Sequence, residues 1–309
     1  MKHTIFAALL AATTLTAACT NEAADDNKTE QTAGKARVRL AIGGIEVQTA
    51  PMTSRAALTA NGKALTDLYI LDYDKTSGKL LQVLHQTSAA ADFAAPELTL
   101  TYGTHTLKAV ATRSETPALL TSALAAYSVA ANTLTEAAAD APLYLSSGKT
   151  SDTFAGQTDI SVTAGAGQTA ALALDRLVAK LVIKATDTAP ADIAAADITL
   201  KEYPRVAWQD FSVIGLAEKH RSADITAWQG KSGNSLAYFV LCPAEGYTTD
   251  ITLSLTAADG TAYTPITLTS VPLERNKITT ISGGLFGHTA AASVSVADAW
   301  STDTHDINL

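Results

Sequence analysis

Cysteine and basic residues are scarce in this sequence of 309 residues. Only two cysteines occur, and Cys19 falls in an N-terminal export segment, so Cys242 has no partner for an intrachain disulfide. Cys242 ends an apolar run and is predicted to be a small buried side chain. Lys and Arg number 22 against 30 Asp and Glu, which gives a formal charge of -8. Without a basic stripe to neutralise phosphates, we expect no nucleic-acid partner.

The first residues predict a targeting segment. A short basic start precedes an apolar run at residues 5–15, which is shorter than the roughly 20 residues of a membrane-spanning helix. Residues 15–19, LTAAC, resemble the lipobox of bacterial lipoproteins, with the leucine one position early. We therefore predict a lipoprotein signal peptide at 1–18, acylation of Cys19 and a flexible acidic leash at 19–36. The alternative is an ordinary secretory signal with an incidental cysteine.

Strand patterns begin directly after the leash. In residues 37–47, Val38, Leu40 and Ile42 alternate with outward-facing positions, which predicts a half-buried strand. Residues 67–73 are apolar on both faces and predict a central strand, followed by a turn at 74–78 and a returning strand. Residues 97–102 and 106–112 are predicted to pair around the turn at Gly103.

In the rest of the chain, short strand patterns again alternate with turn residues at regular spacing. This arrangement predicts an all-β fold of two tandem β-sandwiches. We expect the sandwiches at 37–166 and 167–309, with the glycine-rich segment 164–168 between them. Residues 117–127 begin with proline and have helical spacing, which predicts one short helical excursion. The tail that begins near residue 290 is either the last strand of its own domain or a strand for a neighbour.

The sequence contains no recognised catalytic, metal-binding or phosphate-binding motif. The six histidines form no close metal-ligand pair, and no serine lies in a GxSxG motif. The glycines at 164–168 lack the third glycine of a phosphate-binding loop and precede no helix. We therefore expect no enzyme activity, no cofactor and no metal site.

Several segments taken in order resemble the fimbrillins, the subunits of type V pili of Bacteroidales. They are the signal at Cys19, TSRAAL at 53–58, LTDLYILDYDKTSGKLL at 65–81, LTYGTHTLKAVAT at 100–112, DRLVAKLVIKA at 175–185 and VPLERNKITTISGGLF at 271–286. The resemblance implies two transthyretin-like, Greek-key sandwiches and export as a surface-exposed outer-membrane lipoprotein carrying palmitate. It also implies that an arginine-specific protease removes the first strand, and that a strand from another subunit then enters the groove.

Mapped onto this chain, the resemblance assigns processing to Arg55, with Arg37 and Arg39 as less apt sites. The outgoing strand is then the one with Val38, Leu40 and Ile42. The donor strand lies in residues 293–309, with apolar side chains at Val294, Val296, Trp300, Ile307 and Leu309. The implied partners are other fimbrial subunits, the arginine-specific protease, the outer membrane through the lipid, and host or bacterial surface ligands.

Other interpretations remain open at this point. The chain could be a monomeric surface lipoprotein that binds glycan or a host ligand, with Trp208 and Trp228 as a sugar platform. It could also be a pilus anchor that does not polymerise. In either case, Asp187-Thr188-Ala189 resembles the O-glycosylation sequence of Bacteroides relatives, which would place a glycan on Thr188.

Overall fold

The structure is a computed structural model, and it describes residues 34–43, 46–48, 57–60, 63–113, 142–143, 152–165, 167–207, 212–286 and 292–297. Strands dominate these residues, and the one helical element among them is the 3-10 turn η1, Thr226–Trp228. The prediction of an all-β fold is confirmed. The predicted helical excursion at 117–127 lies outside the described residues.

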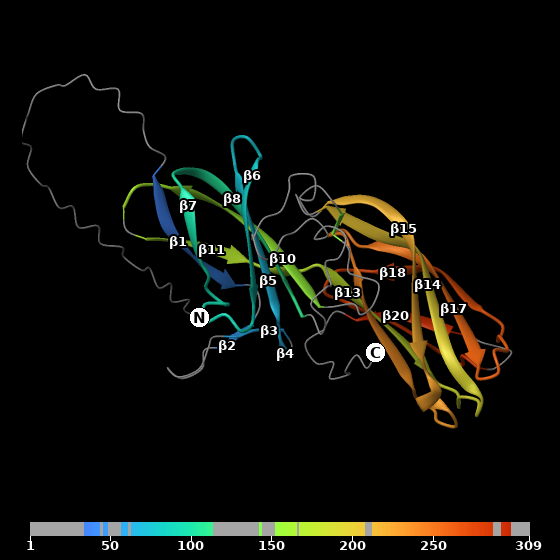
Figure 1. Ribbon diagram of the computed structural model, residues 1–309. Coiled ribbons are helices and arrows are strands. Elements are labelled where there is room, and N and C mark those ends of the chain that lie inside the picture. The colour runs from blue at the N-terminus through green and yellow to red at the C-terminus, as the bar shows by residue number, and fades with distance from the viewer. Residues whose placement is uncertain are drawn as a thin grey trace, which may run out of the picture. The chain divides into compact units, whose positions relative to one another are not determined.

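The first sandwich consists of a three-stranded and a five-stranded sheet, ordered β11-β1-β7 and β12-β10-β8-β5-β6 (Figure 1). Its strands are β1 (Lys35–Gly43), β5 (Asp67–Asp74), β6 (Leu80–Thr87), β7 (Glu97–Thr101), β8 (Gly103–Thr112), β10 (Thr153–Val162), β11 (Gln168–Ala173) and β12 (Asp175–Arg176). As predicted, β5 is a central strand buried on both faces and forms a hairpin with β6. Asp74 closes the hairpin turn by accepting the Ser77 backbone N–H at 2.7 Å.

The second sandwich has sheets ordered β16-β13-β19-β20 and β15-β14-β17-β18. Its strands are β13 (Val178–Ala185), β14 (Ile193–Ala207), β15 (Val213–Asp224), β16 (Ser235–Leu241), β17 (Tyr247–Ala257), β18 (Ile266–Leu273), β19 (Ile278–Gly283) and β20 (Ala292–Ala297). Two tandem sandwiches are therefore confirmed. Residues 213–224, which the sequence analysis left without a strand, form the long edge strand β15.

Short strands accompany the sandwiches. β2 (Glu46–Gln48), β3 (Ala57–Ala60) and β4 (Lys63–Ala64) form a small antiparallel sheet after β1. β9 (Pro142–Leu143) pairs with the end of β14, so a segment that precedes β10 in the chain belongs to a sheet of the second sandwich.

The expected boundary between the sandwiches was placed too early. β11 begins at Gln168, after that boundary, yet it pairs in parallel with β1 from Val38↔Gln168 to Gly43↔Ala173. The glycine-rich segment therefore joins β10 to β11 within the first sandwich, and the second sandwich begins after β12. The expected pairing around Gly103 was also wrong: β7 joins the sheet of β1, whereas β8 pairs with β5 and β10.

The two sandwiches share one topology. Each sandwich has seven main strands, which can be numbered first to seventh in chain order; this count leaves out the short or additional strands β2, β3, β4, β9, β12 and β20. In both sandwiches, one sheet has its strands in the order seventh, first, fourth, and the other sheet has the order sixth, fifth, second, third. The first and seventh strands are parallel in both, as β1 with β11 and as β13 with β19. The duplication leaves no fixed-period repeat in the sequence, because only the pattern of burial and turns is repeated.

Three acidic groups buried in the second sandwich make its stability depend on pH. Burial raises the pKa of the Cys242 thiol from 9.0 to about 12, and it raises the pKa of Tyr203 and Tyr238 from 10.0 to about 12. Cys242 is fully buried, as predicted, and its thiol donates to the Leu273 carbonyl at 3.3 Å.

We expect the free energy of unfolding to fall above about pH 9, because the unfolded chain loses these protons first. The stabilisation is complete below the unfolded pKa values and declines as the pH rises toward the folded ones, by roughly 1.4 kcal/mol per pH unit for each group. Urea titrations between about pH 8 and 11 measure this slope. Cys242→Ala and Tyr238→Phe should each flatten it by one proton; an unchanged slope in both variants would contradict the assignment.

Candidate functional site: the first strand and its groove

β1 lies in the middle of its sheet and carries one wholly apolar face. Its burial alternates strictly, and the inward side chains are Ala36, Val38, Leu40 and Ile42, exposed by 7%, 0%, 0% and 6%. The pattern follows from the two-residue period of a strand, because successive side chains point to opposite faces of the sheet. The predicted half-buried strand is confirmed. Its removal is not tested by the structure and stays a prediction.

These side chains fill a groove that residues far apart in the sequence form together. The apolar partners in this core come from both sheets of the first sandwich and from the connections before β5, before β7 and after β11. They include Leu65, Leu68, Ile70, Phe93, Leu98, Leu100, Leu107, Leu172 and Leu174. Burying a Val, Leu or Ile side chain contributes about 1.5–3 kcal/mol. A chain that lost β1 without a replacement would therefore expose a large apolar surface.

The backbone of β1 is bonded on both edges. Leu40 donates its N–H to the Pro96 carbonyl at 2.9 Å, so the backbone N–H and C=O groups of the even-numbered residues of β1 point toward β7. Leu174 donates its N–H to the Gly43 carbonyl at 2.9 Å, so the backbone N–H and C=O groups of the odd-numbered residues of β1 point toward β11. Taking β1 away would leave unpaired donors and acceptors on two strands at once, and unmade hydrogen bonds are costly. A replacement must therefore be another strand.

Arg55 lies outside the described residues, in the segment that joins β2 to β3. β2 pairs with β3 over three positions, from Glu46↔Thr59 to Gln48↔Ala57. A cut after Arg55 would thus separate β1 and β2 from everything that follows. A cut after Arg37 or Arg39 would leave most of β1 in place, since the strand runs on to Gly43.

Only part of the predicted donor strand is described. Val294 and Val296 lie on β20, which pairs antiparallel with β19, and they are 40% and 37% exposed. β20 buries little side-chain surface and is held mainly by its backbone. Trp300, Ile307 and Leu309 lie outside the described residues, as does Cys19.

Thr188 is exposed in the segment after β13. The neighbouring Asp187 carboxylate accepts the backbone N–H groups of Leu285 and Phe286 at 2.9 and 2.8 Å. The Thr188 side chain is thus presented on an ordered bend, and its glycosylation stays a prediction. For the sugar platform, Trp228 packs against the core of the second sandwich, and Trp208 lies outside the described residues.

Two aspartates of β5, Asp67 and Asp72, each contact a histidine side chain from a neighbouring strand. The more buried of the two pairs has a structural role. His105 donates from Nε2 to the Thr101 carbonyl at 2.9 Å, and its Nδ1 lies 2.7 Å from Asp72 Oδ1. Both ring nitrogens are therefore engaged, which leaves none to act as a general base. Burial raises the pKa of Asp72, and the hydrogen bond to His105 opposes that rise. The second pair, His85 with Asp67 at 2.9 Å, has its ring stacked on Tyr69.

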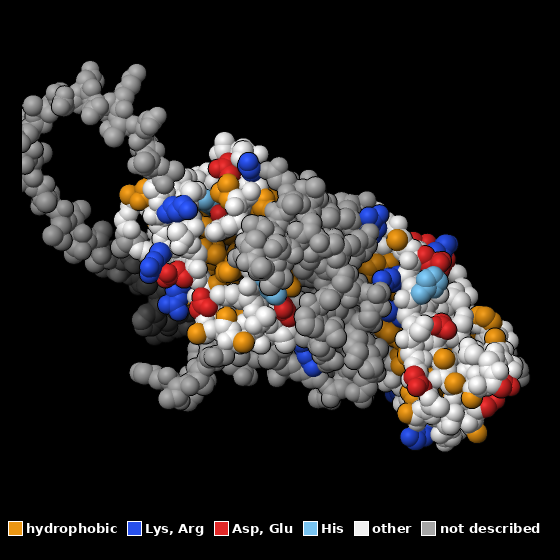
Figure 2. Space-filling model, viewed as in Figure 1, with side chains coloured by type: hydrophobic (Ala, Val, Ile, Leu, Met, Phe, Trp, Pro, Cys, Tyr) orange, Lys and Arg blue, Asp and Glu red, His pale blue; other side chains and the backbone are white. Residues whose placement is uncertain are grey.

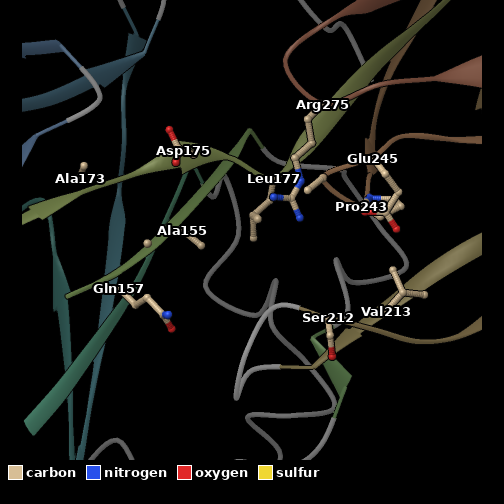
Figure 3. A pocket seen from close by; sticks show the side chains of 12 residues that line it. Ala155, Gln157, Ala173, Asp175, Leu177, Ser212, Val213, Pro243, Glu245 and Arg275 are labelled. Carbon is tan, nitrogen blue, oxygen red and sulfur yellow. The ribbon is translucent and has the colours of Figure 1, made fainter. Parts of the chain in front are cut away.

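A pocket of 590 Å³ lies among residues of both sandwiches (Figure 3). Its polar lining includes Asp175, Glu245 and Arg275. Arg275 donates from Nε to the Cys242 carbonyl at 2.6 Å, and burial lowers its pKa while the two carboxylates oppose the shift. Within the described residues, no three His, Cys, Asp or Glu side chains gather so as to hold a metal ion.

The visible surface of the described residues mixes charges of both signs, and apolar side chains are scattered over it (Figure 2). No large patch of one sign forms among the described residues on this face. None of the helical elements in the described part of the chain is long and apolar enough to cross a membrane.

The described residues form a tandem pair of like-folded sandwiches, each with its first strand at the centre of a sheet. The chain belongs to the family described as "Family of unknown function (DUF6562)", which matches residues 121–308, more than half of its length. A comparison with curated proteins found no match.

Several solved structures are similar to this chain. The fimbrial anchor protein Mfa2 from Porphyromonas gingivalis superposes with a TM-score of 0.50 at 12% identity, covering 86% of this chain and 98% of that one. The tip fimbrial protein Mfa3 from the same organism, with a C-terminal truncation, gives 0.43 at 12% identity over 86% and 100%. A DUF1812 protein from Bacteroides thetaiotaomicron gives 0.48 at 15% identity over 85% and 96%. At these identities, the likeness to Mfa2 establishes the fold alone.

Proposed function

We propose that this chain is a subunit of a cell-surface fimbria that polymerises by strand exchange. The observation that carries the proposal is β1. It fills the centre of a sheet with an unbroken apolar face, and it precedes in the chain the segment that contains Arg55. The fold shared with a fimbrial anchor protein supports a role in a fimbria, and it is equally consistent with the alternative of an anchor that does not polymerise. The subunit would reach the cell surface as a lipoprotein acylated at Cys19.

In this proposal, an arginine-specific protease cuts after Arg55 and residues 1–55 leave with β1. A strand from a second subunit then enters between β7 and β11 and restores both rows of backbone hydrogen bonds. Its alternate side chains refill the positions of Val38, Leu40 and Ile42. Because the contact joins different surfaces on the two partners, it can be repeated head to tail, and it gives a fibre when the rotation between subunits does not close a ring.

Limited digestion of the full chain with an arginine-specific protease tests the proposal. We expect a cut after Arg55, found by N-terminal sequencing, followed by ladders of oligomers on a gel. Arg55→Ala should abolish both, whereas Arg39→Ala should leave both unchanged. If Arg55 is resistant and the chain stays monomeric, the chain is a non-polymerising anchor or a ligand-binding lipoprotein instead.

A further inference from the structure

β20 forms one edge of the sheet β16-β13-β19-β20, and β19 is the only described strand that runs alongside it. The two strands pair antiparallel from Ile278↔Ala297 to Gly283↔Ala292, without a register shift. The side chains of residues 293–297 are all exposed. Within the described part of the chain, the far side of β20 is therefore an open edge of its sheet.

The backbone groups on this open edge can be assigned residue by residue. Thr186 donates its N–H to the Gly283 carbonyl at 2.8 Å, so the N–H and C=O groups of the odd-numbered residues of β19 point toward β13. Those of its even-numbered residues point toward β20, where the register pairs them with odd-numbered residues. The backbone groups of Val294 and Val296 therefore point away from the sheet, and no hydrogen bond from another described residue reaches them.

The same two valines form an apolar rim on the inner face of the sheet. Val294 lies opposite Ile281, and Val296 lies opposite Thr279. Directly opposite side chains share a face, and Ile281 belongs to the core of the second sandwich, so both valines point to the core side. They are nevertheless 40% and 37% exposed. The edge strand of the facing sheet, β18, packs against β13 and β19, so β20 extends beyond the cover that this sheet provides.

β20 lacks the usual protection of an edge strand. Natural edge strands are guarded against pairing with another chain by charged side chains, proline or bulges. In the facing sheet, β18 contains Pro272 and a left-handed Ser270, at a φ of 55°, and its ladder has a register shift. The other edge strand of that sheet, β15, contains Glu218, Lys219 and Arg221. β20 reads ASVSVA, without a charge or a proline.

We propose that two copies of this chain pair through the outer edges of their β20 strands, antiparallel, with Ser295 of one copy opposite Ser295 of the other. This register places Val294 of each copy opposite Val296 of its partner. Both pairs have outward backbone groups, so each exchanges two hydrogen bonds. The two-fold axis stands perpendicular to the sheet, which brings the four valine side chains together on one face. Because the strand is uncharged and matches itself in this register, a second copy is the occupant that fits the edge.

The contact is isologous, so it closes at two copies and cannot give a ladder of oligomers. It requires no release of β1 and is thus independent of the proposed strand exchange. Six residues at one edge bury less surface than the roughly 1,200–2,000 Å² of a standard stable interface. We therefore expect a weak dimer, which a covalent trap detects better than a measurement of mass at equilibrium.

Disulfide trapping of Ser295→Cys in the uncut full chain tests the contact. In the proposed register, the two Ser295 residues form a non-hydrogen-bonded pair, whose Cα atoms are about 4.5 Å apart and thus within reach of a disulfide. Ser293→Cys is the matched control, because it lies on the same exposed face of β20 but opposite Ala297 of the partner. Every variant carries Cys19→Ala, and Cys242 is buried, so the new cysteine is the one accessible thiol. Thermal unfolding checks that each variant is folded.

In a glutathione redox buffer, we expect at least roughly tenfold more linked dimer from Ser295→Cys than from Ser293→Cys, measured on a non-reducing gel. An equimolar mixture of Ser293→Cys and Ala297→Cys should recover linked dimers, because these positions oppose each other across the contact. Adding Val294→Lys to Ser295→Cys should reduce linkage to the control level, whereas Val294→Ile should not. Equal linkage of Ser295→Cys and Ser293→Cys would overturn the proposal, and so would linkage of Ser295→Cys that Val294→Lys leaves unchanged.

Discussion

Replacing Leu40 by alanine should destabilise the first sandwich by about 2–5 kcal/mol, which is the usual cost of such a truncation in a core. The Leu40 side chain is fully buried at the centre of β1, among residues of both sheets. Chemical denaturation followed by an unfolding signal of the first sandwich measures the loss. If β1 fills a core position, the loss should be accompanied by faster release of β1 after proteolysis.

Arg39→Gln is the matched control for Leu40→Ala. Arg39 directly precedes Leu40 in β1, and its side chain lies on the exposed face. We expect a change within about 0.5 kcal/mol, as for most surface substitutions. A loss of equal size in both variants would show that β1 is sensitive to any change in its sequence, and that its buried face is not what holds it.

Replacing Asp152 by alanine should cost about 3–5 kcal/mol, because it would leave a buried guanidinium without its counter-charge. Asp152 accepts two hydrogen bonds from Arg176, at 2.7 Å from Nε and 2.9 Å from Nη2, and both side chains are only 8% exposed. Arg176 also stacks on Phe154 and donates to Asn276, which precedes β19. The cluster therefore fixes the connection between the two sandwiches.

A double-mutant cycle that combines Asp152→Ala with Arg176→Met measures the interaction free energy between these two side chains. The double variant should be more stable than Asp152→Ala alone, since it removes the stranded charge. The exposed ion pair between Lys75 and Asp159 is the control for this buried pair. Its charged atoms are 2.8 Å apart, and both side chains are 53% exposed. Lys75→Gln should cost no more than about 1 kcal/mol. Additive losses in the cycle would contradict a coupled buried pair.

Local patterns were sufficient to predict the strands whose faces differ in polarity. The alternation around Leu40 and the turn at Asp74 predicted β1 and the β5–β6 hairpin, because both depend on neighbouring residues. Pairing between distant strands was not predictable in this way. The parallel ladder of β1 with β11 joins Val38 to Gln168, and no local signal encodes it. For that reason, β11 was assigned to the wrong sandwich.

Sequence reasoning also failed where polar residues occupy unusual places. β15 is rich in charged residues because it is an exposed edge, and it was therefore not recognised as a strand. Lys180 alternates with apolar residues along β13, a pattern that indicates an outward-facing side chain, yet it is 3% exposed and lies near the buried Asp152 carboxylate, whose charge it stabilises. At the candidate site, the apolar face of β1 could be predicted. Its two bonded edges could not, because they are formed by β7 and β11.

The most direct test of strand exchange is the native mass of the oligomers that form after arginine-specific digestion of the full chain. If β1 is the strand that is exchanged, every copy in an oligomer should lack residues 1–55, and the released peptide should be free in solution. If residues 1–55 remain bound to the cut subunit, and that subunit stays monomeric, β1 is a permanent strand and the account of this chain as a polymerising fimbrial subunit is wrong.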